Sequence, residues 1–208
     1  EKLGLKDELI GVGLARIDYT KGLPERLRAL DHVLDRHPEY VGKLVFLQMG
    51  ATSRLRLASY QSINEEIDNL VAEINTRYGN DHWKPIIYLP DDPPATTRMA
   101  SRRLAHFCIV SSLHDGMNLV AKEFVASRFD EDGVLILSTF TGAARELTDA
   151  LLVNPYATDQ LAEAIHTALQ MPEEERRHRM QRMRSVVQEH NIYKWATDLI
   201  SEFAGFGE

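Results

Sequence analysis

The chain has 208 residues, of which 44% are hydrophobic and 26% are charged. These fractions are those of a globular protein, so a disordered chain is excluded, and the length fits one well-packed domain spanning residues 1–208. The 31 acidic residues exceed the 24 basic residues, which gives a formal net charge of -7. That balance argues against nucleic acid as a partner, although it leaves room for a small basic pocket that binds phosphate.

The cysteine content and the hydropathy of the chain exclude internal disulfides, cysteine-based metal sites and membrane-spanning segments. Cys108 is the one cysteine, so neither an internal disulfide nor a cysteine-based metal site can form. It lies in the apolar run 106–110, where we expect a small buried hydrophobic side chain. No apolar stretch approaches the roughly 18 residues of a membrane span, and the N-terminus has no signal-peptide pattern. We therefore expect a cytoplasmic protein that does not associate with membranes.

Short apolar runs alternate with longer amphipathic patterns along the chain. Strands are predicted at residues 10–17, 43–49, 85–89, 106–111, 133–138 and 151–153. Helices are predicted at residues 24–36, 59–78, 118–128, 158–170, 172–189 and 193–203. The prolines of the segment 90–94 exclude regular structure until the next helix.

This alternation predicts the fold class. Strands that are apolar on both faces and are separated by helices indicate a parallel sheet covered on both sides. We therefore expect an α/β fold with a doubly wound, Rossmann-like sheet. Such sheets bind ligands beyond the carboxyl ends of their strands, and the unusual polar motifs of this chain all follow predicted strands.

The first motif follows the first strand. Arg16 and Lys21 lie five residues apart in a loop that turns at Gly22 and then starts a helix. Two cations beside a helix N-terminus suit a diphosphate, because both neutralise phosphate oxygens. The alternative is a solvated loop whose cations pair with Asp18 or Glu25.

The second motif follows the fourth strand. Asp115 precedes a turn and a predicted helix start, where the amides of residues 116–120 are available to oxygen atoms of a ligand. Asp115 could accept hydrogen bonds from sugar hydroxyls, and Glu123 could accept both hydroxyls of a ribose. In the alternative interpretation, Asp115 caps the helix and Glu123 is a surface partner of Lys122 or Arg128.

Two weaker motifs follow other strands. Arg54 comes soon after the second strand and could reach a phosphate of a second substrate, or it could face solvent. After the fifth strand, the small residues of the segment 142–144 allow close approach of a neighbouring backbone, and Glu146 either supports the second motif or caps a helix. The histidines show no metal-binding spacing, and no Asp-x-Asp pair suited to a metal-bound diphosphate follows a strand.

In their order and spacing, these segments resemble glycosyltransferase family 20, the trehalose-6-phosphate synthase family. The most specific is Asp-Gly-Met-Asn-Leu-Val-Ala-Lys-Glu at 115–123. The other matching segments are 16–26, 52–54, 75–79, 133–138 and 144–156. The resemblance implies the donor-binding, C-terminal half of a two-domain GT-B enzyme. It also implies transfer of glucose, with retention of configuration, from a nucleoside diphosphate glucose to glucose 6-phosphate, giving trehalose 6-phosphate.

The resemblance also implies roles for single residues, with UDP-glucose as the favoured donor and with no metal or other cofactor. Catalysis falls to Arg16 and Lys21, which hold the departing diphosphate, and to Asp115, which binds the glucosyl group. The remaining donor contacts come from Gly116, Met117, Asn118, Leu119, Val120 and Glu123. Arg54 matches the arginine that contacts the acceptor phosphate.

Three positions depart from the family pattern. His114 replaces a usual arginine, the proline-rich segment 91–94 replaces one that supplies an aromatic residue near the base, and Gly13 and Leu14 replace an acidic residue. A glucosylglycerol-phosphate synthase and a pseudoglycosyltransferase therefore remain alternatives. A non-catalytic nucleotide-sugar-binding module is an alternative of a different class. A sugar-phosphate isomerase is a more distant one.

Because the resemblance covers only the C-terminal half of the family, we expect the family's N-terminal domain to be missing from these 208 residues. We expect the helix at 193–203 to pack on that domain, and its apolar residues to favour a homo-oligomer when they are exposed.

Overall fold

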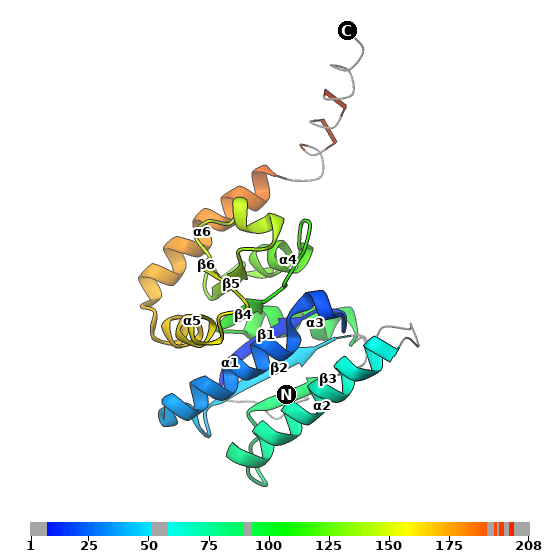
Figure 1. Cartoon of the computed structure of the whole chain (residues 1–208). Coiled ribbons are helices and arrows are strands. Elements are labelled where there is room, and N and C mark those ends of the chain that lie inside the picture. The colour runs from blue at the N-terminus through cyan, green and yellow to red at the C-terminus, as the bar shows by residue number, and fades with distance from the viewer. Residues whose placement is uncertain are drawn as a thin grey trace.

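The computed structural model describes residues 8–50, 58–89 and 93–190, together with residues 194, 196, 197, 200 and 201. Its centre is a six-stranded parallel sheet with strand order β3-β2-β1-β4-β5-β6 (Figure 1). The order reverses between β1 and β4, which makes the sheet doubly wound and confirms the predicted fold class. The strands are β1 (Leu9–Leu14), β2 (Leu44–Met49), β3 (Ile86–Leu89), β4 (Phe107–Val110), β5 (Val134–Ser138) and β6 (Leu151–Val153).

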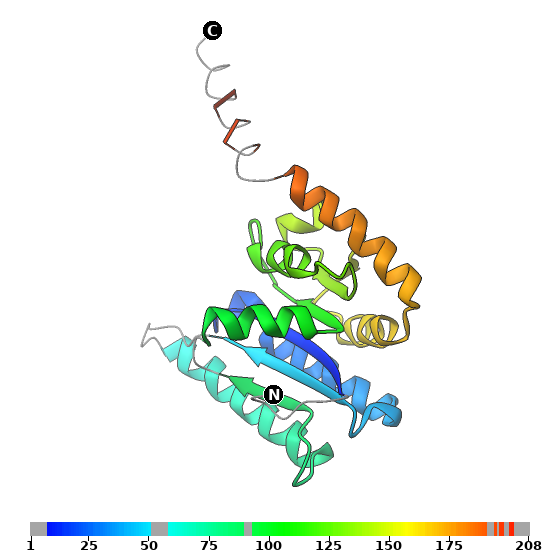
Figure 2. The same cartoon turned by 180° about the vertical axis from the view of Figure 1, so that it is seen from behind.

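Helices cover both faces of this sheet. They are α1 (Leu23–Arg36), α2 (Ala58–Tyr78), α3 (Ala95–Leu104), α4 (Leu119–Ser127), α5 (Thr158–Gln170) and α6 (Glu173–Glu189). Helices α1, α2 and α5 pack on one face, and α3, α4 and α6 lie on the other, as the two opposite views show (Figures 1 and 2). The sheet is therefore buried on both sides, as its apolar strands require.

The strands supply both cores because successive side chains point to opposite faces. In β2, Leu44 and Phe46 belong to the core under α1, α2 and α5, whereas Val45, Leu47 and Met49 belong to the core on the other face. All six residues of β2 are buried. The two hydrophobic cores, one on each face, thus hold the strands in place and with them the strand ends, where the polar motifs lie.

All six predicted strands are present, with bounds close to those expected. The strand predicted at 10–17 is too long, because it ends at Leu14. The following residues leave the sheet and enter a 3-10 helix, Tyr19–Lys21, in which the Thr20 amide donates to Asp18. No bounds were predicted for α3, and the helix predicted at 193–203 lies largely outside the described residues.

The structure bears on the predictions for Cys108 and for membrane-spanning helices. Cys108 is fully buried, as expected, and burial raises the pKa of its thiol to about 12. No helix in the described part of the chain is long and apolar enough to cross a membrane. The cytoplasmic location stays a prediction.

Candidate functional site

A cavity of about 480 Å³ opens at the carboxyl ends of β1 and β4, where the strand order reverses. This volume lies in the range of small-molecule sites. The first two sequence motifs meet there. The predicted site residues that line the cavity are Arg16, Lys21, Asp115, Gly116, Met117, Asn118, Leu119 and Val120.

An ion pair between Lys21 and Asp115 joins the two motifs across 94 residues of sequence. Lys21 Nζ donates to Asp115 Oδ2 over 2.8 Å, and the same oxygen accepts hydrogen bonds from Asn118 Nδ2 at 2.8 Å and Ser112 Oγ at 3.2 Å. Burial opposes ionisation of Asp115, but the hydrogen bonds from Lys21 and Asn118 outweigh it and lower the pKa of the carboxyl. The cavity therefore contains a fixed, ionised carboxylate.

The ion pair between Lys21 and Asp115 predicts how the stability of the fold depends on pH in acid. Because the pKa of Asp115 is lower in the folded chain, its stabilising effect is complete above the ordinary aspartate pKa of about 3.9. The effect is lost as the pH falls through the lower, folded value. The stability advantage of the wild type over Asp115→Asn should therefore disappear as the pH is lowered below that ordinary value. Urea unfolding from pH 6 to pH 2 measures this, and the exposed Asp81→Asn is the control.

The start of α4 presents free backbone donors to the cavity. Asn118 adopts a left-handed conformation, with φ of 67°, and its side chain caps the helix by accepting from the amide of Ala121. Asn118, and not Asp115, is therefore the helix cap. Among the described residues, the amides of Gly116, Met117, Leu119 and Val120 have no hydrogen-bond acceptor. A helix N-terminus with free amides favours a negatively charged ligand.

Arg16 adds a second positive charge at this cavity. Its side chain is exposed and has no hydrogen-bond or ion-pair partner in the part of the chain that the structure describes. Among the described residues, neither cation forms an ion pair with Asp18 or Glu25: Lys21 pairs with Asp115, although the charges of Lys21 and Arg16 help to lower the pKa of Asp18. The Arg16 guanidinium is available to a ligand.

Arg26 lies against the same cavity and was not predicted from the sequence. Its guanidinium is fully buried, and it donates to Ser111 Oγ at 2.9 Å and to Gln48 Oε1 at 3.1 Å. No carboxylate forms an ion pair with it among the described residues, and burial lowers its pKa to about 10. The sequence held one signal: Arg26 shares a helix face with the buried residues Leu30 and Leu34.

Gly13 makes the space that Arg26 occupies. A Cβ atom added at Gly13 would overlap Arg26 Nη1 and the Phe46 ring. We expect Gly13→Ala to lower the free energy of unfolding by about 1–3 kcal/mol, since overpacking displaces a hydrogen-bonded network. Thermal unfolding measures the loss. Gly116→Ala is the matched control, because a Cβ there meets no atom within 4 Å. Equal stability of the two variants would contradict the prediction.

A second, smaller cavity of about 160 Å³ shares Leu14, Ala15, Arg16 and Val120 with the first. Its wall also includes Arg98 and Arg102, both from α3. Arg102 is buried, its Nη2 forms an ion pair with Glu123, and its Nε has no hydrogen-bond partner in the described structure. Glu123 is therefore held by Arg102, and not by Lys122 or Arg128 as one interpretation of the sequence had it.

Three further predictions concern Arg54, Glu146 and the segment 142–144. Arg54 lies outside the described residues, so its role stays a prediction. Glu146 accepts hydrogen bonds from Lys122 Nζ at 2.9 Å and from His190 at 2.8 Å, which anchors the middle of α4. The predicted close approach at the segment 142–144 is confirmed, since a Cβ at Gly142 would overlap the carbonyl oxygen of Gly116.

Comparisons with known proteins show the family of this chain. A profile of glycosyltransferase family 20 matches residues 2–205. The chain belongs to this family. It is 43% identical to the trehalose-6-phosphate synthase of Enterobacter sp. (strain 638) over 203 residues, which are 95% of this chain and 43% of that protein. The chain thus spans less than half the length of this relative.

Solved structures of the family give the same result. The structure of the E. coli protein bound with UDP-2-fluoro glucose superposes with a TM-score of 0.92 and 40% identity, over 97% of this chain and 45% of that one. An α,α-trehalose-phosphate synthase (UDP-forming) from Burkholderia xenovorans, solved in complex with glucose-6-phosphate, gives a TM-score of 0.91 and 38% identity, over 94% and 44%. The fold and the family are therefore shown, and the chain matches one part of these longer proteins.

Proposed function

We propose that this chain is the donor-binding domain of a retaining glycosyltransferase that moves glucose from UDP-glucose to glucose 6-phosphate. The products are trehalose 6-phosphate and UDP. The observation that carries the proposal is the meeting, in one cavity, of Arg16, Lys21 and the free amides at the start of α4. One relative is named a UDP-forming α,α-trehalose-phosphate synthase, and two similar structures were solved with UDP-2-fluoro glucose and with glucose-6-phosphate.

The diphosphate binds between Arg16, Lys21 and the amides of Leu119 and Val120. Negative charge grows on the leaving diphosphate as the glycosidic bond breaks, so cations fixed beside it stabilise the transition state. The two side chains thereby supply the positive charge that a metal ion supplies in other transferases. No resident metal ion or other cofactor is proposed for this pocket.

The glucosyl group binds next to the diphosphate. The ionised Asp115 accepts hydrogen bonds from sugar hydroxyls, and its orientation is fixed by Lys21 and Asn118. The backbone of Gly116, Met117 and Asn118 completes this part of the pocket. Since hydrogen bonds to charged groups are stronger than neutral ones, Asp115 is the main anchor of the sugar.

The nucleoside binds in the second cavity. Glu123 is not among the residues that line this cavity, but it pairs with Arg102 of the cavity wall, and it accepts the ribose hydroxyls with the carboxylate oxygen that Arg102 leaves available. The guanidinium of Arg102, whose Nε has no hydrogen-bond partner among the described residues, becomes a donor to an oxygen on the nucleoside if its side chain shifts on binding. An unsatisfied buried donor costs stability, and a ligand acceptor removes that cost.

The reaction needs no nucleophile from the chain. A hydroxyl of glucose 6-phosphate attacks the anomeric carbon on the face from which UDP leaves, and its proton passes to a phosphate oxygen of UDP. Arg54 binds the phosphate of the acceptor. A second domain, of the kind that fills the other half of the relatives, closes over the pocket and brings the acceptor into line.

Calorimetric titration with UDP-glucose, GDP-glucose and ADP-glucose tests the donor pocket. We expect UDP-glucose to bind most tightly, and Arg16→Ala and Glu123→Ala each to weaken it by roughly tenfold or more, because each removes a charged hydrogen-bond partner. Arg177→Ala is the control, since Arg177 pairs with Glu173 on the surface of α6. The donor-pocket proposal fails if no nucleotide sugar binds, or if both variants bind like the wild type.

Release of UDP tests the reaction itself. The chain should be joined to an upstream domain taken from a relative and assayed with UDP-glucose and either glucose 6-phosphate or glycerol 3-phosphate. Turnover with glucose 6-phosphate supports the proposal. Turnover only with glycerol 3-phosphate would instead identify a glucosylglycerol-phosphate synthase, the alternative that His114 raises. Binding without turnover would favour a non-catalytic module.

A further inference from the structure

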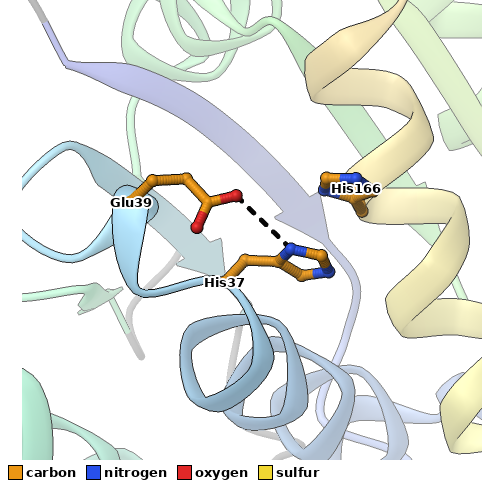
Figure 3. A group of neighbouring side chains, drawn as sticks. All are labelled: His37, Glu39 and His166. Carbon is orange, nitrogen blue, oxygen red and sulfur yellow. Dashed lines mark ion pairs between the residues drawn. The ribbon is translucent and has the colours of Figure 1, made fainter.

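Two histidines and a glutamate, His37, Glu39 and His166, lie close together (Figure 3). His37 and Glu39 follow α1 and precede β2, whereas His166 lies on α5. The donor cavity lies beyond the carboxyl ends of the strands, but these residues lie before the amino end of β2. The glycosyl-transfer site therefore makes no use of them.

We propose that His37, Glu39 and His166 form a binding site for a zinc ion. Two imidazoles and a carboxylate are a common set of zinc ligands, with a fourth position left for water. One ligand atom of each residue lies within 4.8 Å of the other two. This is the one such cluster in the described part of the chain.

The distances fit a site that closes when the side chains rotate. Two ligands bound to a tetrahedral zinc at about 2.0–2.1 Å lie roughly 3.3 Å apart. His37 Nδ1 and Glu39 Oε1 are already 3.4 Å apart. The rings of His37 and His166 are stacked, with centroids 3.8 Å apart and planes within 7°. The lone pairs of parallel rings point side by side, so one imidazole must rotate before both nitrogens can face a shared ion.

His166 is held by neighbours in the way that zinc-bound histidines are. Its Nδ1 lies 2.9 Å from Tyr40 Oη, which leaves Nε2 as the ligand atom. Tyr40 Oη also accepts a hydrogen bond from Gln170 Nε2 at 3.0 Å. Such partners of metal-binding histidines fix the ring and strengthen metal binding.

The arrangement is built from two short pieces of sequence. The four residues 37–40 supply two ligands and the orienting phenol, and α5 supplies His166 with Gln170 one turn later. The two helices involved, α1 and α5, already pack together, so a bound ion would bridge a preformed contact. No ligand spacing is visible in the sequence because His37 and His166 belong to separate segments.

Titration of the metal-free, tag-free chain with zinc chloride, followed calorimetrically, tests the site. We expect one equivalent of zinc to bind with micromolar affinity and to raise the Tm, since a ligand that binds the folded state stabilises it. His166→Ala should abolish this binding. Tyr40→Phe should weaken it by about tenfold, as loss of an orienting partner does at other metal sites.

Matched controls distinguish this site from zinc binding elsewhere on the chain. His178→Ala should bind zinc like the wild type, because His178 is exposed on α6. Glu39→Gln, which changes an exposed side chain and should leave the fold intact, should also weaken zinc binding. UDP-glucose affinity should be the same with and without zinc. The proposal is overturned if zinc does not bind, or if it binds equally to wild type, His166→Ala and Glu39→Gln.

Discussion

Replacement of Lys21 by alanine is expected to weaken UDP-glucose binding by roughly 100-fold or more. A hydrogen bond to a charged group contributes about 1.5–3 kcal/mol, and Lys21 is proposed to make one to the diphosphate. The substitution also leaves Asp115 without its cation at 2.8 Å, so an uncompensated carboxylate then faces an anionic ligand. The two effects act in the same direction. Calorimetric titration of the folded variant measures the loss.

A second substitution separates these two effects. In the double variant Lys21→Ala/Asp115→Asn, the repulsive carboxylate is gone, so part of the lost affinity for UDP, which lacks the glucosyl group, should return. Lys43→Ala is the control, because Lys43 is exposed and precedes β2, at the opposite end of the strand from the cavity. A Lys21→Ala affinity within threefold of the wild type would rule out Lys21 as a diphosphate ligand.

The layers of the fold can be predicted from the sequence because local patterns determine them. Apolar runs indicated all six strands, and longer helical patterns indicated α1, α2 and α5 with nearly correct bounds. The same reasoning placed Arg16 and Asp115 near each other, because carboxyl ends of parallel strands lie at one edge of a sheet. That two residues lie at the same edge of the sheet can be predicted without knowledge of side-chain contacts.

Pairings that depend on tertiary packing could not be predicted in this way. The partner of Glu123 is Arg102, which lies on α3, the helix for which no bounds were predicted. Lys122 and Arg128 were candidates only because they are neighbours in sequence. In the structure, Lys122 reaches Glu146 instead, and Arg128 donates to the carbonyl oxygen of Arg102.

The contact between His37 and His166 likewise could not be predicted from the sequence. A spacing rule detects metal ligands only when they lie on one local element, such as neighbouring turns of a helix. Here α1 and α5 are distant in sequence and are brought together by packing on one face of the sheet. Clusters of this kind are therefore found from the fold.

Replacement of Arg26 by alanine is expected to lower the free energy of unfolding by about 3–5 kcal/mol, the range for loss of a large buried side chain together with its hydrogen bonds. The truncation leaves a cavity under the first turn of α1 and removes the donors to Ser111 Oγ and Gln48 Oε1. A change of this size lowers the Tm of a 208-residue chain by roughly 10 °C. Urea and thermal unfolding measure it, and a loss below about 1 kcal/mol would contradict the prediction.

The variant Arg26→Met tests whether the buried charge of Arg26 serves ligand binding or stability. Methionine keeps most of the volume and removes the cost of a desolvated guanidinium without a carboxylate partner, so this variant should be more stable than Arg26→Ala. Because Arg26 lines the cavity, removal of its charge should still weaken UDP-glucose binding. A folded Arg26→Met chain with reduced donor affinity would mean that the buried charge serves the ligand at some expense of stability. Unchanged affinity would instead assign Arg26 a purely structural role.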